Sequence, residues 1–157
     1  MPKRPSRQST RVARLRRRVL PPASVREIRM PSRRTAIAPT VERILRAARS
    51  AGLAPEQRMD LAVAIAEALS NAVVHGNQQR AGTHVAIRVT VVPGRRATVD
   101  VRDSGTGFDH TSLRDPTDPT HLLTPGGRGV FLMRRLVDRL VVKPPGNHVT
   151  LTMRTRS

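Results

Sequence analysis

The chain has 157 residues, a formal net charge of +18 and no cysteine, tryptophan or tyrosine. Without cysteine it can form neither a disulfide framework nor a cysteine-ligated zinc site, and it has no thiol nucleophile. Its longest purely apolar run, Leu61–Ala66, is far too short to cross a bilayer, so we expect a cytoplasmic protein without a membrane segment.

The basic residues are concentrated near the N-terminus. Residues 1–34 hold 12 Lys and Arg and one acid, Glu27, whereas residues 35–157 hold 17 Lys and Arg and 10 acids. Residues 1–24 contain four prolines and few apolar side chains, so they are predicted to form a disordered Arg-rich arm. This arm is either a solvated tail or a weak contact site for a polyanion.

The first predicted elements are one strand and two helices. Residues 25–30 alternate apolar and polar side chains, which is the pattern of a half-buried strand. Residues 37–51 place apolar side chains on one helical face, and Gly52 ends that segment. Pro55 opens a second helix, which is expected to run to about His75.

The second half of the chain adds strands and one more helix. Strands are predicted at about 83–92 and 96–102, followed by an irregular segment at 103–126. A third helix is expected at about 129–140 and a last strand at about 148–154. This order predicts an α+β two-layer sandwich, in which the helices cover one face of a mixed, mostly antiparallel sheet.

The second helix carries a polar stripe on an otherwise apolar surface. It is apolar almost all round, which predicts burial on most sides. Glu67, Asn71 and His75 are four residues apart and therefore share one face. The stripe is either a solvated side of the helix or a functional pair, in which a carboxylate base lies one turn from an amide that can bind a metal ion. His75 by itself is expected to cap or brace the helix end.

Two glycine segments could approach a ligand closely. Asp103, Gly105 and Gly107 follow a predicted strand, so a carboxylate stands at the strand end beside a permissive backbone. The alternative for this segment is an ordinary Asp-Gly turn. The Gly-Gly-Arg-Gly run at 126–129 opens a helix, where free N–H groups and the helix dipole favour a phosphate. The alternative there is a flexible turn.

The order and spacing of these motifs resemble those of the GHKL ATPases, the superfamily of DNA gyrase, heat-shock chaperones and histidine kinases. Residues 67–75 resemble its N-box, residues 103–107 its G1 box and residues 127–138 its G2 box. Over about residues 25–155 the amino-acid sequence is most similar to those of the anti-sigma-factor serine kinases. The resemblance implies a histidine-kinase-like ATPase domain with the Bergerat ATP-binding fold at 25–157.

The resemblance also implies roles for single residues. Glu67 would be the general base that activates a serine hydroxyl on a partner, and Asn71 would be the Mg²⁺ ligand. Asp103 would anchor the adenine, and residues 108–126 would form the ATP lid. The residues that would contact the nucleotide are Asn71, Asp103, Gly105, Gly107, Gly127, Arg128, Gly129, Val130 and Asn147.

One position departs from the family pattern. The family commonly has Gly-Thr near the final strand, where the Thr helps to hold the adenine site, whereas this chain has Gly146-Asn147. An Asn side chain keeps a donor and an acceptor, so the hydrogen bonding can be retained.

The function that the resemblance implies is that of an anti-sigma regulatory factor with serine/threonine-protein kinase activity, which uses ATP and Mg²⁺. Its partners would be a small anti-anti-sigma (STAS-type) protein, phosphorylated on Ser, and an RNA polymerase sigma factor that it sequesters. These kinases often form homodimers. The alternatives are a nucleotide-dependent binding switch without phosphate transfer, a stand-alone histidine-kinase-like ATPase domain, and a nucleic-acid binder that acts through residues 1–24.

Overall fold

The computed structural model describes residues 22–107 and 127–156. Five strands form one sheet in the order β1-β2-β3-β5-β4, and every neighbouring pair is antiparallel. The strands are β1 (Ser24–Pro31), β2 (His84–Val92), β3 (Arg96–Arg102), β4 (Arg139–Lys143) and β5 (His148–Arg154). The helices are α1 (Ile37–Ala47), α2 (Pro55–Asn71) and α3 (Gly127–Leu136).

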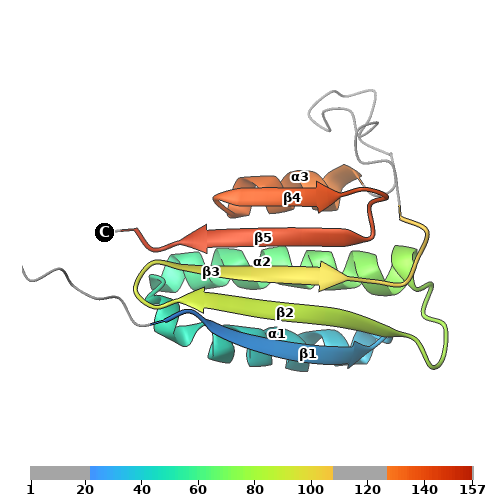
Figure 1. The fold of residues 1–157 in the computed structure, drawn as a ribbon. Helices are drawn as coiled ribbons and strands as arrows, with labels where there is room; N and C mark the ends of the chain where they lie inside the picture. The colour runs from blue at the N-terminus through green and yellow to red at the C-terminus, as the bar shows by residue number, and fades with distance from the viewer. Residues whose placement is uncertain (1–21, 108–126, 157) are drawn as a thin grey trace, which may run out of the picture.

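Among the described residues, all three helices lie on one face of the sheet and none lies on the other (Figure 1). The predicted two-layer α+β sandwich with a mostly antiparallel sheet is thereby confirmed. Most of the predicted arm at 1–24 and the whole predicted lid at 108–126 lie outside the described residues, and Ser24 already belongs to β1. No helix in the described ranges combines the length and the apolar character that a bilayer span requires.

The hydrophobic core fills the space between the sheet and the helices. Strand residues alternate between the two faces of a sheet, so every second residue of β2 and β3 is buried beneath the helices. Helix residues complete the core from the other side. Its largest fully buried apolar side chains are Met30, Ile44, Leu61, Ile65, Leu69, Met133, Leu151 and Met153.

Helix α2 lies between α1 and α3 on the sheet (Figure 1). Pro55 occupies its first turn, where the missing N–H costs nothing. The prediction that this helix is buried on most sides is confirmed for residues 61–74, in which only Val63 is exposed, at 45%, whereas Met59 in the preceding turn is 70% exposed. Within the described ranges, the sheet and the two flanking helices α1 and α3 contact α2, and Met59 and Val63 are exposed on its outward side.

The end of α2 is wider than a regular helix. The α-helix stops at Asn71, and residues Ala72–Gly76 form a turn of π-helix. The N–H of Asn77 donates to the carbonyl of Ala72 at 2.8 Å, five residues back. Such single π-turns occur frequently at functional sites.

The prediction of one helix over 129–140 was wrong at its end. Helix α3 stops at Leu136, and β4 begins three residues later as an edge strand that the sequence interpretation missed. Apolar residues continue at helical spacing through this boundary, and no Gly or Pro marks it. The carboxylate of Asp138 accepts the backbone N–H of Arg154 at 2.6 Å, which joins the turn after α3 to the end of β5.

Candidate functional site

Glu67 and Asn71 lie against the first turn of α3. A Cβ placed on Gly129 would be 2.9 Å from Oε2 of Glu67 and 3.3 Å from Nδ2 of Asn71. Both polar side chains are half-buried. Because the first N–H groups of a helix have no partner within it, this contact places a carboxylate and an amide beside the free donors of α3.

The third member of the predicted polar stripe is separated from this contact. His75 falls in the widened turn after α2 and is exposed. The structure therefore brings Glu67 and Asn71 together at Gly129, and it places His75 on the surface.

A second cluster forms around Asp103, just beyond β3. Its carboxylate lies against the α-carbon of Gly76, so that a Cβ on this glycine would overlap all three carboxylate atoms. Oδ1 of Asp103 accepts the N–H of Gly105 at 2.8 Å. Burial raises the pKa of the Asp103 carboxyl above its ordinary value of 3.8, and the bond from Gly105 opposes part of that rise.

The segment after Asp103 is held by the turn between β4 and β5. The N–H of Asp103 donates to the carbonyl of Asn147 at 3.1 Å, and Nδ2 of Asn147 donates to the carbonyl of Gly105 at 3.1 Å. Gly107 has a φ of +84° and lies against the carbonyl of Pro145, so only glycine fits there. Asn147 therefore fixes the loop beside Asp103 by hydrogen bonds to its backbone.

One structurally central residue, Asn77, directly follows the glycine that ends the second helix. Asn77 is fully buried, and its Nδ2 donates to Oγ of Ser32 at 2.7 Å and to the carbonyl of His84 at 3.0 Å. Its Oδ1 accepts the N–H of Ser104 at 2.8 Å. Asn77 thus ties the end of β1, the start of β2 and the loop after β3 to the end of α2. An Asn directly after the Gly that ends a helix was the available signal.

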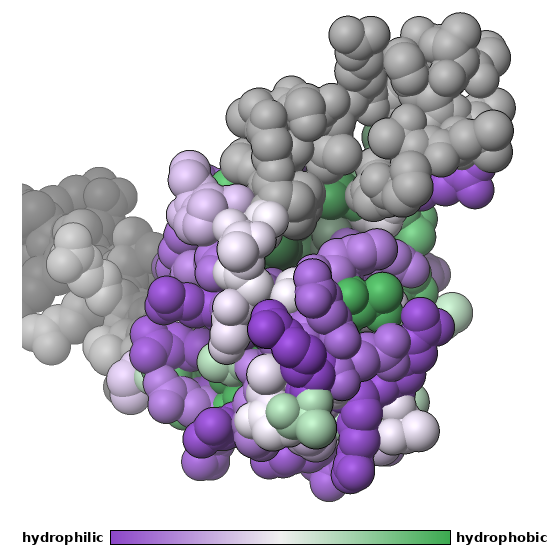
Figure 2. All heavy atoms as spheres, turned by 90° about the vertical axis from the view of Figure 1, so that its right-hand side faces the viewer, coloured by the Kyte–Doolittle hydropathy of each residue, from purple (hydrophilic) through white to green (hydrophobic). Residues whose placement is uncertain are grey.

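The two clusters share the C-terminal end of α2. Asn71 is the last residue of α2, and Gly76 ends the turn of π-helix that follows it. The other predicted site residues on α3 take different positions: Arg128 is exposed, and Val130 is buried under the first turn. Figure 2 shows this end of the molecule, where hydrophilic residues predominate and apolar ones show between them.

The residues at this end fit a nucleotide with a divalent cation. Among the described residues no donor binds Oδ2 of Asp103, so this oxygen can accept a hydrogen bond from an exocyclic amine. The amide of Asn71 offers an oxygen to a cation. The described ranges hold no group of three or more His, Asp or Glu side chains arranged for a metal. Mg²⁺ bound through phosphates needs only one or two protein ligands.

The chain is similar to one protein family and to several named bacterial proteins. The profile of the histidine kinase-like ATPase domain family matches residues 30–153. The serine-protein kinase RsbW of Bacillus subtilis (strain 168) is 34% identical over 100 residues, which cover 60% of this chain and 60% of that protein. RsbW of Bacillus pumilus (strain SAFR-032) is 32% identical over 110 residues, 65% of this chain and 67% of the relative.

A relative that is named an anti-sigma factor is similar over a comparable length. The anti-sigma F factor of Clostridium acetobutylicum is 27% identical over 92 residues, which cover 56% of this chain and 62% of that protein. The chain thus spans about three fifths to two thirds of the length of these relatives.

Proposed function

Because the chain belongs to the family of histidine kinase-like ATPase domains, we propose that it is an ATP-dependent protein serine kinase that acts as an anti-sigma regulatory factor. Two kinds of relative support this proposal, since one is named a serine-protein kinase and the other an anti-sigma factor. The observation that carries it is the contact of Glu67 and Asn71 with Gly129 at the start of α3.

The proposed nucleotide site uses both clusters. ATP would supply the phosphoryl group, and Mg²⁺ would neutralise charge on its phosphates. Oδ2 of Asp103 would accept the adenine amine, and the first turn of α3 would donate N–H groups to the phosphates. Asn71 would hold the Mg²⁺ ion. The remaining residues of the proposed site are Gly105, Gly107, Gly127, Arg128, Gly129, Val130 and Asn147.

Glu67 is the proposed general base. It would accept the hydroxyl proton of a partner's serine while that oxygen bonds to the transferred phosphorus. A base must lie within hydrogen-bond reach of the proton that it removes. The contact with Gly129 supports this role because it places the carboxylate beside the helix end that would hold the phosphates.

The partners follow from the proposed activity. The phosphorylated substrate would be a small STAS-type anti-anti-sigma protein, and the second partner would be an RNA polymerase sigma factor that the protein sequesters. Both partners belong to the cytoplasm, which is the proposed location. We also propose that the protein can form a homodimer and that residues 1–24 can make weak polyanion contacts.

The test is phosphate transfer by Glu67→Ala. The variant is incubated with labelled ATP, Mg²⁺ and a STAS-type protein, and label on the serine is measured. Removal of a general base should lower the rate about 10²- to 10⁴-fold, while nucleotide affinity measured by calorimetry stays near that of wild type. Glu56→Ala, at the exposed start of α2, is the control and should transfer normally.

Three outcomes would contradict parts of the proposal. Transfer by Glu67→Ala at the wild-type rate would exclude Glu67 as the base. Absence of transfer by the wild type, together with nucleotide-dependent partner binding, would make the protein a binding switch. Transfer to a histidine of the partner would make it a histidine kinase domain.

A further inference from the structure

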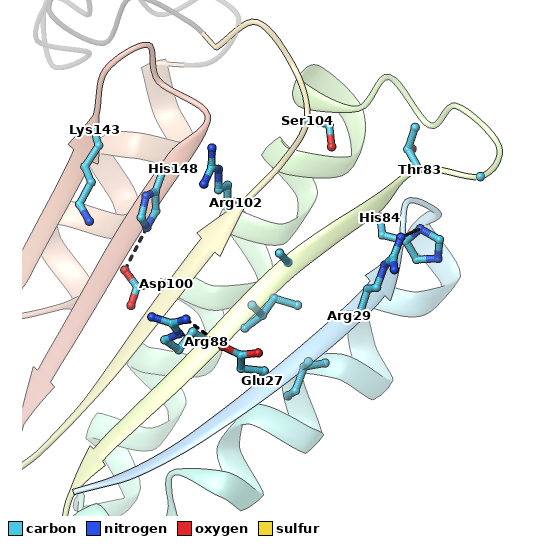
Figure 3. Close-up of a pocket in the computed structure, with 14 residues that line it drawn as sticks. Glu27, Arg29, Thr83, His84, Arg88, Asp100, Arg102, Ser104, Lys143 and His148 are labelled. Carbon is cyan, nitrogen blue, oxygen red and sulfur yellow. Dashed lines mark hydrogen bonds and ion pairs between the residues drawn. The ribbon is translucent and has the colours of Figure 1, made fainter.

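The sheet face that carries no helix has a hollow with charged walls. Its volume is about 920 Å³, and its lining comes from all five strands and from the loops at one end of the sheet (Figure 3). This hollow lies across the sheet from the helices and therefore does not include the contact between α2 and α3. The inference drawn from it does not depend on the proposed kinase activity.

The strand register places one row of cationic side chains across this hollow. Arg29 pairs with Ala86, Ala86 with Arg102, Arg102 with His148, and His148 with Lys143. These five residues, one from each strand, are called the cationic row. Ala86 is its only member without a nitrogen-bearing side chain. Figure 3 shows the labelled members of the row projecting from the same face of the sheet.

The adjacent row on the same face consists of Glu27, Arg88, Asp100 and Thr150, and both of its acids have partners. Arg88 forms an ion pair with Glu27 at 2.8 Å. Asp100 lies 3.0 Å from Nε2 of His148 and accepts a hydrogen bond from Thr150 at 2.6 Å. Both acids of the hollow are therefore already engaged.

Apart from His148, the nitrogen-bearing members of the cationic row have no carboxylate partner among the described residues, although Nη2 of Arg29 lies 3.4 Å from Nδ1 of His84. Within the described ranges, no carboxylate lies within ion-pairing distance of Arg29, Arg102 or Lys143. All three residues are exposed. Three unneutralised cations on one side of a hollow make a surface that attracts negative charge.

We propose that the cationic row binds an acidic segment of a partner protein. Neighbouring strands are about 4.8 Å apart, so Arg102 is separated by about 10 Å from Arg29 on one side and from Lys143 on the other. Carboxylates recur at about this distance on one face of a helix when they are seven residues apart. The small side chain of Ala86 leaves room for such a segment over the middle of the row.

The residues of this face are less well suited to a nucleic acid or to a second copy of the chain. Glu27, Arg88 and Asp100 lie two residues along their strands from the row, or about 7 Å, and add no net positive charge, so a continuous phosphate backbone would meet unpaired cations along one row only. The chain also has no Tyr or Trp to stack on bases. A second copy would bring an identical face with more Lys and Arg than acids, so like charges would oppose the contact.

The two lysines of the chain allow a direct experiment, since only Lys3 and Lys143 carry side-chain amines. The full chain is mixed with fluorescent poly-L-glutamate of about 30 residues, and affinity is measured by anisotropy at about 0.15 M salt. A carbodiimide then couples carboxylates to nearby amines, and mass spectrometry locates the adducts. We expect coupling at Lys143.

Matched variants separate the row from the general positive charge. Arg29→Ala with Arg102→Ala should weaken poly-L-glutamate binding about fivefold to tenfold and reduce coupling at Lys143. Arg43→Ala with Arg58→Ala removes the same charge from exposed positions on α1 and α2 and should change neither. Arg29→Lys with Arg102→Lys keeps the charge and should bind like wild type.

Several results would overturn the proposal. Equal losses in the two Ala double variants would mean that the attraction is general. Coupling confined to Lys3 and the N-terminal amine would place the contact on the arm. Tighter, row-dependent binding of a 20-base-pair DNA duplex would assign the face to nucleic acid. A dimer in sedimentation that the row variant abolishes would assign it to self-association.

Discussion

The carboxylate of Asp103 occupies the space in which a side chain of Gly76 would begin. The two residues come from different layers, because Gly76 ends the widened turn after α2 and Asp103 follows β3. Their contact brings the end of the helix onto the end of the strand, and it leaves Oδ2 of Asp103 without a donor among the described residues. Nucleotide binding, as proposed, depends on this contact.

Gly76→Ala should therefore weaken nucleotide binding. The added methyl group would overlap the carboxylate and displace it, and overpacking of this kind typically costs about 1–3 kcal/mol. The backbone of Gly76 does not have a positive φ, so the clash and not backbone strain causes the effect. We expect a large loss of nucleotide affinity, measured by calorimetry, and a moderate fall of the melting temperature.

A double variant tests this explanation. In Gly76→Ala with Asp103→Gly the clash is absent, so the melting temperature should recover while nucleotide affinity stays low. If the double variant is as unstable as Gly76→Ala alone, the methyl group and the carboxylate are not in conflict.

Gly129→Ala should separate phosphate transfer from stability. Its Cβ would lie 2.9 Å from Oε2 of Glu67, a flexible side-chain end that can move away. Stability should therefore change little, whereas displacement of a positioned group by about 1 Å can lower the rate up to about 100-fold. Labelled phosphate on the partner serine gives the rate, and thermal melting gives the stability. A rate equal to wild type would show that the contact has no role in transfer.

The raised pKa of Asp103 predicts how nucleotide affinity depends on pH. The adenine amine is a donor, so it favours the ionised carboxylate. As pH falls through the raised pKa of Asp103, the carboxylate is protonated and affinity should decline, starting at a higher pH than an ordinary Asp would give. Calorimetric titration with ATP between about pH 4 and 8 measures this. An affinity that is constant across the range would contradict the assigned role.

The same raised pKa predicts the opposite trend for stability. Because the folded-state pKa of Asp103 is above the unfolded value, its contribution is fully present at low pH and is lost as pH rises through the folded-state pKa. Asp103→Asn removes this titration. The variant should therefore gain stability relative to wild type as pH increases from about 3 to 7, as measured by urea unfolding.

Asn77→Ala should be strongly destabilising although the residue touches no proposed ligand atom. It would remove the three hydrogen bonds that the Asn77 side chain makes with the Ser32 hydroxyl, the His84 carbonyl and the Ser104 N–H. Lost buried bonds of this kind cost about 2–4 kcal/mol in total, or a melting temperature roughly 10 °C lower for a chain of this size. Ser50→Ala, at an exposed position, should melt like wild type.

Much of the fold could be predicted from residue patterns alone. Strands β2 and β3 alternate between buried and less buried residues along their whole length, and β1 does so over residues 27–30; that alternation is visible in the sequence. The β4 strand could not be predicted, because Leu136 and Leu140 continue the apolar spacing of α3. Residues 139–143 form a strand because they pair with β5 at the edge of the sheet, and this pairing is not visible in the local sequence pattern.

The candidate site was only partly predictable for a similar reason. The spacing of Glu67 and Asn71 places them on one face, but their contact with Gly129 depends on how α3 packs against α2. The position of Asn77 after the glycine that ends a helix is a local signal, but its bonds to Ser32 and Ser104 join segments that are distant in sequence, so no local pattern could indicate its role. The cationic row depends on the order of the strands, since its members come from all five.

The turn of π-helix at Ala72–Gly76 limits how the length of this chain can vary. Deleting one residue there would restore regular winding and rotate Gly76 by about 100° around the helix axis, away from Asp103. The N–H of Gln79 still donates to the carbonyl of Val73 in that turn, whereas a Cβ on Gly82, in the exposed part of the loop before β2, would meet nothing within 4 Å. Insertions and deletions compatible with binding should therefore accumulate at 81–82, and the five residues after Asn71 should keep their number.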